Sequence, residues 1–326
     1  MPLGEFDLIA RYFTRSPRRA ALGIGDDCAL LAPLPAGQQL AVSSDLLVEG
    51  RHFLSTVAPD RLGHKALAVN LSDLAACGAE PVAFTLSLAM PRVDEAFLDG
   101  FSRGLFALAD AHVIELVGGD TTAGPLAICI TVFGSVPVGQ ALLRSGAQAG
   151  DALWVSHPVG GGLGDARLAL EVFRGTQRVP GEAFERLRER MEQPIPRVAL
   201  GIALRGLATS AIDLSDGLVG DLGHVLARSG VGATLQADAL PCSAALSAMP
   251  RSVQRECGLS GGDDYELLFT APPDHERALR DAAARCAVAV SCIGTVDAAP
   301  GLRIVDADGR AMPQTYAAFD HFKAQT

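Results

Sequence analysis

The sequence predicts an α/β fold of α+β layers divided into two domains, and three observations predict it. Apolar runs typical of strands alternate with amphipathic stretches typical of helices in both halves of the chain. At 326 residues, the chain is about twice as long as an average domain. The stretch 136–151 is rich in glycine, proline and small residues. We therefore expect an N-terminal domain over residues 1–143 and a C-terminal domain over residues 144–326.

The first half predicts three helices and four strands. A short amphipathic helix is expected over residues 4–12. Leucine and phenylalanine recur at helical spacing over residues 59–77 and 94–111, and Gly78 and Pro81 end the first of these helices. The strand-like runs of the first half are 40–43, 83–89, 114–117 and 126–133.

The second half repeats the same kinds of element. Its expected helices are 164–173, 198–206 and 218–229. Its expected strands are 151–156, 267–270, 288–292 and 302–305. A short sequence echo links residues 25–31 and 262–268, and we read it as a chance similarity.

Composition excludes several classes of protein. The net charge of −10 disfavours a nucleic-acid binder. The chain has only two lysines, Lys65 and Lys323, and neither follows a glycine-rich turn, so any ATP site is not a P-loop. Seven cysteines without a C-x-x-C pair suggest buried thiols in a reducing cytoplasm.

No segment predicts a membrane span or a signal peptide. Charged residues interrupt the apolar N-terminal stretch. The longest uncharged stretch, 124–143, contains glycines and a proline and begins with strand formers. We expect it to form a buried strand and a turn.

Six places share one pattern, in which an apolar run and a small residue precede an aspartate. For any single case, a turn or a helix cap is the more common role. Asp216 could cap the helix that follows it, and Asn70 and Asp73 could form a solvated stripe on theirs. The six segments are 23–27, 42–45, 70–73, 117–120, 213–216 and 260–264.

Taken together, these aspartates favour a divalent metal site. Several follow buried-looking strands, where an ionised carboxylate is costly unless it is paired or coordinates a metal. The nearby cations are too few to pair all of them. Oxygen ligands without Cys or His suit Mg²⁺ or Ca²⁺, and Mg²⁺ held by carboxylates is commonly completed by substrate phosphates. The main local cations are Arg51, His52, Lys65 and Arg144.

Other catalytic chemistries find less support. The chain lacks H-E-x-x-H, G-x-S-x-G and any zinc spacing. The glycine-rich run 157–164 does not fit G-x-G-x-x-G, because Asp165 fills the last position. We expect that run to be a loop, with contact to phosphate as a secondary possibility.

Seven segments give the chain a resemblance to the thiamine-monophosphate kinases, in order along its whole length. This family lies within a wider ATP-binding superfamily that includes aminoimidazole ribonucleotide synthetase. The resemblance implies the two-domain fold of that synthetase, a cytoplasmic homodimer built by the N-terminal domains, and ATP in the cleft. The segments are GIGDDCALL, SSDLLVEGRHF, KALAVNLSDLAACGAEP, VGGDTT, RSGAQAGD, IDLSDGL and GGDDYELLFT.

The resemblance also implies roles for individual residues. The catalytic set would be Asp45, Asp120, Arg144 and Asp213. Mg²⁺ ions would be held by Asp27, Ser43, Ser44, Asp45, Asp73, Asp120, Asp213 and Asp216. ATP would contact Gly119, Asp120, Arg144 and Ser215, and thiamine monophosphate would contact His52, Asp263 and Phe319. The family commonly has Glu where this chain has Asp263 and Thr where it has Ser44.

These roles predict direct in-line transfer of the γ-phosphoryl group from ATP to thiamine monophosphate, assisted by several Mg²⁺ ions. The acceptor is a phosphate monoester with a second pKa of about 6, so it is already a nucleophile at neutral pH. Two alternatives are a related ATP-dependent ligase or synthetase and a sensor that binds MgATP without turnover. Nucleic acid and membrane are not expected as partners.

Overall fold

The computed structural model describes residues 4–313 and Tyr316. The chain divides into two compact units, one of residues 1–74 and 79–139 and the other of residues 75–78 and 140–326. Each unit has a sheet of its own. Within the described residues, no helix combines the length and the apolar character that a membrane crossing requires.

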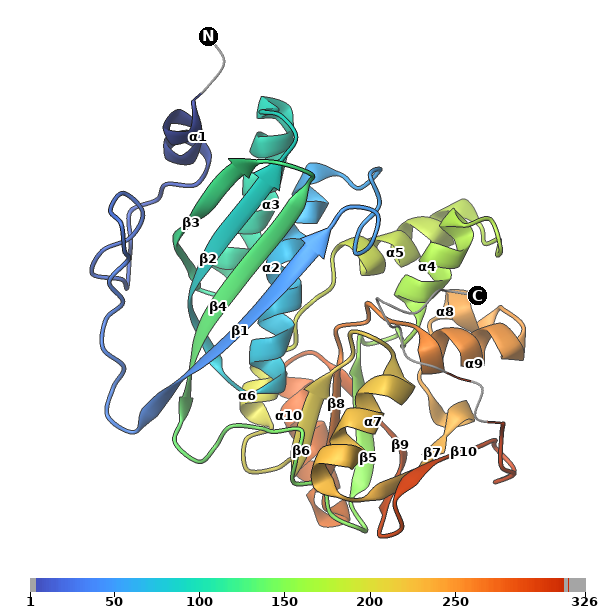
Figure 1. Cartoon of the computed structure of the whole chain (residues 1–326). Helices are drawn as coiled ribbons and strands as arrows, with labels where there is room; N and C mark the ends of the chain where they lie inside the picture. Colours follow the sequence, from blue (N-terminus) through green and yellow to red (C-terminus); the bar gives the residue numbers. More distant parts are fainter. Residues whose placement is uncertain (1–3, 314–315, 317–326) are drawn as a thin grey trace. The chain divides into compact units, whose positions relative to one another are not determined.

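The first unit contains a four-stranded sheet in the order β1-β4-β2-β3 (Figure 1). β2 and β3 are parallel, and the other neighbouring pairs are antiparallel. The strands are β1 (Gln38–Val48), β2 (Glu80–Met90), β3 (Glu115–Ala123) and β4 (Ala127–Pro137). The helices of this unit are α1 (Glu5–Tyr12), α2 (Pro59–Ala76, whose last two residues belong to the second unit) and α3 (Glu95–Ala111).

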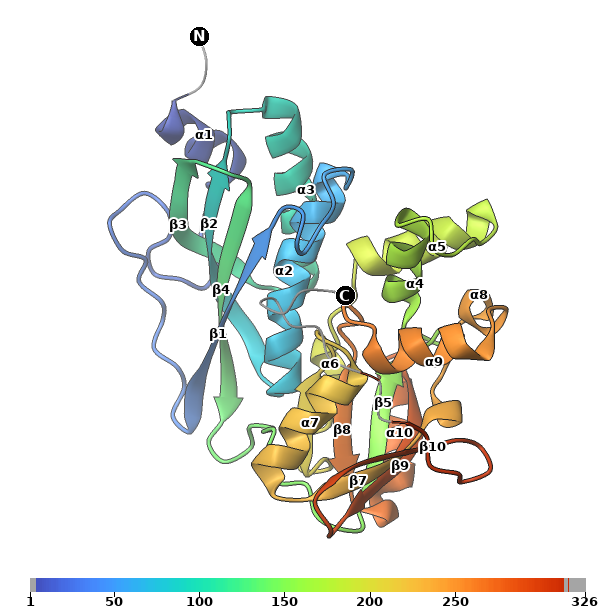
Figure 2. The same cartoon turned by 45° about the vertical axis from the view of Figure 1, so that its right-hand side comes forward.

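α2 and α3 lie on the same side of this sheet (Figure 2). Two glycines let the helices touch at the backbone. A Cβ atom on Gly63 would lie 2.0 Å from the carbonyl oxygen of Phe101, and one on Gly104 would lie 1.8 Å from that of Asp60. Leucines of α2, among them Leu67 and Leu71, are fully buried.

The opposite face of the sheet carries exposed apolar side chains. Side chains alternate along a strand, so Leu40, Val42 and Leu46 of β1 share one face, while Leu47 is buried on the other. Those three side chains are 48%, 56% and 54% exposed. This pattern leaves a large apolar surface on one side of β1.

The second unit contains a six-stranded sheet in the order β10-β7-β9-β5-β8-β6. β10 and β7 are parallel, and the other neighbouring pairs are antiparallel. The strands are β5 (Ala152–His157), β6 (Ser210–Asp213), β7 (Gly232–Gln236), β8 (Leu267–Ala271), β9 (Ala289–Asp297) and β10 (Gly301–Val305).

Helices cover both faces of this second sheet. Leu153 and Val155 pack in one core with α7, whereas Trp154 lies 4.9 Å beneath the guanidinium of Arg280 on α10. A smaller core joins α4, α5, α8 and α9. The helices are α4 (Asp165–Phe173), α5 (Gly181–Glu192), α6 (Val198–Ala203), α7 (Leu218–Ser229), α8 (Ala244–Ser247), α9 (Arg251–Ser260) and α10 (Glu276–Arg285).

The elements expected from periodicity are present at or near their predicted bounds. The expected helix over 218–229 is α7, and the uncharged stretch 124–143 forms β4 and a turn. The thiol prediction was wrong in part. All seven cysteines are thiols, but Cys257 is the buried one, while Cys28 and Cys292 are exposed.

Candidate active site

A polar cluster joins β1 to α2 in the first unit. Its members are Ser43, Asp45, Asn70 and Asp73, which we call the β1–α2 cluster. The Ser43 hydroxyl donates to Oδ2 of Asp73 over 2.5 Å, and the backbone N–H of Asp45 donates to Oδ1 of Asn70 over 3.1 Å. Asn70 is 1% exposed, so the helix stripe of Asn70 and Asp73 points inward to the strand and not to solvent.

Two other predicted ligands lie elsewhere on the same sheet. The hydroxyl of Ser44 bonds to that of Thr131 over 2.9 Å, on the face opposite Ser43 and Asp45. Asp120 lies on β3, so β4 and β2 separate it from Asp45 on β1. At the usual strand spacing, that separation is roughly 14 Å.

Three predicted residues of the first unit remain, Asp27 and His52 in loops and Gly119 on β3. Asp27 is exposed, and its backbone N–H bonds to Oδ1 of Asp26 over 2.9 Å. Gly119 has φ 148°, and a Cβ there would lie 1.8 Å from the carbonyl oxygen of Leu86. A side chain at this position is therefore excluded, which lets β3 run close to β2.

His52 is held by two neighbours. The backbone N–H of Val48 donates to its Nδ1 over 3.0 Å, so the neutral ring carries its proton on Nε2. Nζ of Lys65, a residue 2% exposed, donates to the carbonyl oxygen of His52 over 3.1 Å. The one lysine of the described residues therefore orders the loop that contains His52.

In the second unit, residues 213–217 form a turn between β6 and α7. Asp213 ends β6 and is 5% exposed. The carboxylate of Asp221, in the first turn of α7, accepts from the backbone N–H groups of Ser215 over 3.1 Å and Asp216 over 3.2 Å. Gly217 is the N-cap of α7, so the suggested capping role of Asp216 was wrong.

Burial controls the electrostatics of Asp221. Burial, and after it the neighbouring charge of Asp216, raise the pKa of the Asp221 carboxyl to about 7, against the opposing effect of the backbone N–H donors. The sequence analysis missed this residue. Its signal was an acid on an apolar helix face, because Asp221 stands three residues after Leu218 and next to Leu222.

A second turn, residues 261–266, lies against the first. The backbone N–H of Asp263 donates to the carbonyl oxygen of Ser215 over 2.9 Å, and that of Tyr265 donates to Leu214 over 2.8 Å. The Tyr265 hydroxyl donates to Oδ1 of Asp263 over 3.1 Å. We call residues 213–217 and 261–266 the paired turns.

Two buried acidic residues of the second turn, Asp264 and Glu266, tie it to neighbouring segments. Asp264 accepts from the backbone N–H of Gly164 with both oxygens, over 2.9 and 3.1 Å, and burial raises its pKa well above the ordinary value. Glu266 is completely buried and bonds to the guanidinium groups of Arg197 and Arg190. The last amide of the glycine-rich run 157–164 thus binds a carboxylate of this chain.

Seven of the fourteen predicted residues gather at two places: Ser43, Asp45 and Asp73 in the β1–α2 cluster, and Asp213, Ser215, Asp216 and Asp263 in the paired turns. Outside both places lie Asp27, Ser44, His52, Gly119, Asp120 and Arg144. Arg144 is exposed, and its carbonyl oxygen accepts from Ser229. Phe319 lies outside the described residues. Among residues 4–313 and Tyr316, no group of three or more His, Cys, Asp or Glu side chains is placed to hold a metal ion.

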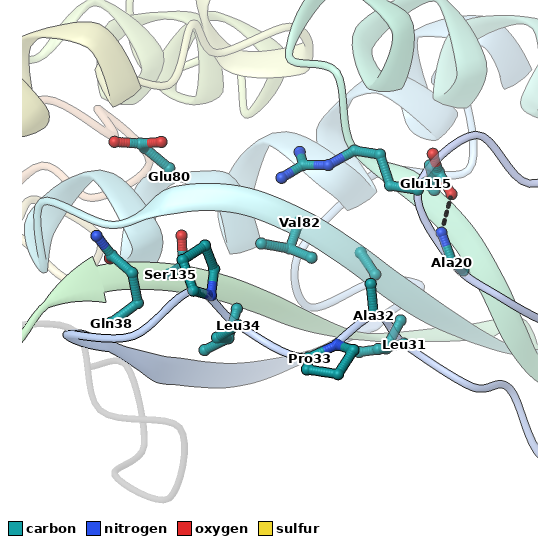
Figure 3. Close-up of a pocket in the computed structure, with 13 residues that line it drawn as sticks. Ala20, Leu31, Ala32, Pro33, Leu34, Gln38, Glu80, Val82, Glu115 and Ser135 are labelled. Atoms are coloured by element: carbon teal, nitrogen blue, oxygen red, sulfur yellow. Dashed lines mark hydrogen bonds between the residues drawn. The ribbon is translucent and has the colours of Figure 1, made fainter.

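A pocket of about 210 Å³ in the first unit lies away from these residues (Figure 3). Loop residues 31–35 and side chains of the sheet line it, with Glu80 and Glu115 among them. Glu115 accepts from the backbone N–H of Ala20 over 3.3 Å. No predicted site residue lines this pocket within the described chain.

The comparisons with known proteins agree across the whole chain. Residues 25–136 match the N-terminal domain of the AIR synthase related proteins, and residues 148–307 match their C-terminal domain. The thiamine-monophosphate kinase of Salmonella typhimurium (strain LT2) is 46% identical over 331 residues, which cover 99% of each chain.

Two solved structures extend the agreement to three dimensions. The crystal structure of the thiamine-monophosphate kinase from Stenotrophomonas maltophilia K279a has a TM-score of 0.83 and 45% identity, covering 94% of this chain and 95% of that one. The structure of AaThiL complexed with AMPPCP and TMP has a TM-score of 0.76 and 28% identity, covering 90% of each chain.

Proposed function

Because the chain belongs to the thiamine-monophosphate kinase family, we propose that it transfers the γ-phosphoryl group of ATP to thiamine monophosphate, giving thiamine diphosphate and ADP. The observation that carries this proposal is 46% identity to a kinase of that name along 99% of the chain. The complex of AaThiL with AMPPCP and TMP supports the same pair of substrates.

The chemistry requires alignment more than proton transfer. The acceptor is a phosphate monoester whose second pKa is about 6, so it is ionised and nucleophilic at neutral pH. A general base is not needed. The site has to bring the acceptor oxygen in line with the γ-phosphorus and neutralise the charge of both phosphates.

The β1–α2 cluster fits Mg²⁺ by the chemistry of its donors. It offers hydroxyl, carboxylate and amide oxygens, which are the ligands that hard divalent cations prefer. When bound, Mg²⁺ would neutralise negative charge on the transferring phosphoryl group. The residues proposed to hold the ions are Asp27, Ser43, Ser44, Asp45, Asp73, Asp120, Asp213 and Asp216.

The other predicted residues would bind the organic substrates. Gly119, Asp120, Arg144 and Ser215 would contact ATP. The Nε2–H of neutral His52 would donate to the phosphate of the acceptor, and the carboxylate of Asp263 would face its cationic ring. Phe319 would add an aromatic contact to that ring.

A homodimer formed through residues 1–143 is supported by the exposed face of β1. Leu40, Val42 and Leu46 are each about half exposed, and an apolar strand surface of this kind is typical of an interface between subunits. We propose residues 144–326 as the second domain, carrying the paired turns.

The first experiment incubates the pure protein with ATP, Mg²⁺ and thiamine monophosphate and follows both products by chromatography. Equal amounts of ADP and thiamine diphosphate would support the kinase. ADP without thiamine diphosphate would point to a ligase or synthetase with another acceptor. MgATP binding without either product would favour a sensor.

A further inference from the structure

We propose that Tyr265 is a positioning residue for Asp263 and that its phenol fixes the direction in which this carboxylate meets the substrate. The inference rests on the proposed function, because it assumes that Asp263 faces the cationic ring of thiamine monophosphate. Tyr265 itself is 8% exposed, so it acts through Asp263.

The first observation is the hydrogen bond between the two side chains. The Tyr265 hydroxyl donates to Oδ1 of Asp263 over 3.1 Å, although the two residues are only two positions apart. In an extended strand, residues so spaced point the same way but stand well apart. A local bend must therefore bring the phenol back to the carboxylate.

The backbone provides that bend. Asp263 has φ 66° and Tyr265 has φ 49°, both in the left-handed region. This conformation is uncommon for residues other than glycine, and a bulky aromatic residue is a clear outlier there. Such conformations persist only where the surrounding structure enforces them, and they concentrate at functional sites.

Hydrogen bonds on both sides enforce the conformation. Asp263 is tied through its backbone N–H to Ser215, and Tyr265 is tied to Leu214. Between them, the buried carboxylate of Asp264 holds the amide of Gly164. The turn is thus fixed at three consecutive residues. The phenol holds Asp263, the one acidic residue of the turn that is not buried.

The consequence concerns binding of the acceptor. A short aspartate held in one orientation loses little further conformational entropy when it meets a cation. Without the phenol, the carboxylate would lose a bond that holds its orientation and would have more freedom to lose during binding. The effect should fall on thiamine monophosphate and spare ATP.

The test compares Tyr265→Phe with the wild type, with Tyr12→Phe as a matched control in the first unit. We expect the KM for thiamine monophosphate to rise roughly tenfold, the scale of a lost hydrogen bond to a charged group. The KM for ATP and kcat should change by less than about twofold on the same reasoning, because both are set by groups elsewhere. The Tm should stay close to that of the wild type, since the ring is retained.

A double-mutant cycle separates positioning from a general structural role. In an Asp263→Ala background, Tyr265→Phe should raise the KM for thiamine monophosphate no further, because the residue through which it acts is gone. An equal rise in that background, or an equal rise in both KM values, would overturn the proposal. Wild-type protein that makes no thiamine diphosphate would instead refute the proposed function.

Discussion

The hydroxyl of Ser43 donates to Oδ2 of Asp73 across 2.5 Å, and this bond joins the middle of β1 to α2. Ser43 and Asp73 are both proposed to hold Mg²⁺, and this bond also orients the carboxylate of Asp73. Ser43→Ala should then raise the Mg²⁺ concentration for half-maximal activity by about tenfold or more, since loss of the orienting bond alone commonly has an effect of about that size. Asp73→Asn should cost more. The control is Asp99→Asn, an exposed residue of α3, and Mg²⁺ titrations of initial rate provide the measurement.

Removing the charge of Asp221 should loosen the turn proposed to bind ATP. Both backbone N–H groups donate to Oδ2 of its carboxylate, and an asparagine could offer only a neutral amide oxygen in that place. We expect Asp221→Asn to raise the KM for ATP by about tenfold, on the scale of hydrogen bonds that lose a charged acceptor. Asp281→Asn, on the exposed side of α10, is the control. An unchanged KM for ATP would mean that the turn does not depend on this carboxylate.

The pH dependence of stability should report the buried state of Asp264. Burial raises its pKa in the folded protein, so the native state binds a proton more tightly than the unfolded chain does. This contribution to the free energy of unfolding is present at low pH and is lost as pH rises above about 3.8, the ordinary pKa of an aspartate, and through the raised pKa of the folded protein. The Tm of Asp264→Asn relative to wild type should therefore increase between pH 5 and pH 8. A constant difference in Tm would contradict the assignment.

Disrupting the exposed face of β1 should separate the subunits. Val42 is 56% exposed, so an aspartate there would cost the folded monomer little but would place a charge in the proposed interface. Val42→Asp should sediment as a monomer at micromolar concentration, whereas wild type should sediment as a dimer. Val159→Asp, on an exposed loop residue of the second unit, should leave the dimer intact. A monomeric wild type would refute the proposed assembly.

The contact between α2 and α3 should tolerate no methyl group. A Cβ on Gly104 would lie 1.8 Å from the carbonyl oxygen of Asp60, so Gly104→Ala must push the helices apart, and overpacking of this kind costs typically about 1–3 kcal/mol. Gly223→Ala is the opposite case, since no atom lies within 4 Å of its Cβ position on α7. That variant should gain about 0.4–1 kcal/mol. Thermal unfolding of both proteins measures the contrast.

Periodicity in the sequence predicted the elements with a strongly apolar face. α2, α3 and α7 were found in this way, as were the strands of both sheets that contain long apolar runs. It missed α5, α9 and α10, whose sequences are mostly polar and bury only a few residues each. It also missed three elements that are too short to show a period, β6 (Ser210–Asp213), β7 (Gly232–Gln236) and α8 (Ala244–Ser247).

The sequence predicted which residues belong to the candidate site but not how those residues are arranged in space. The aspartates themselves were visible because the same pattern, an apolar run and a small residue before an aspartate, recurs in six segments. Their partners were not, because Asn70 and Asp264 take their roles from contacts with distant segments. The face that each β1 side chain occupies could not be predicted either, because the sequence does not show whether Asp45 or its neighbours face the exposed side of the sheet.

Because side chains alternate along β1, two separate proposed properties depend on the register of this one strand. Ser43 and Asp45 point towards α2, while Val42, Ser44 and Leu46 point the other way. A one-residue deletion upstream of Ser43 that shifted the strand in its sheet would exchange these sets. Apolar side chains would then face α2, and the carboxylate would face the proposed subunit interface. Substitutions can remove the proposed metal binding or the proposed assembly one at a time, whereas a register shift of one position in this strand would remove both.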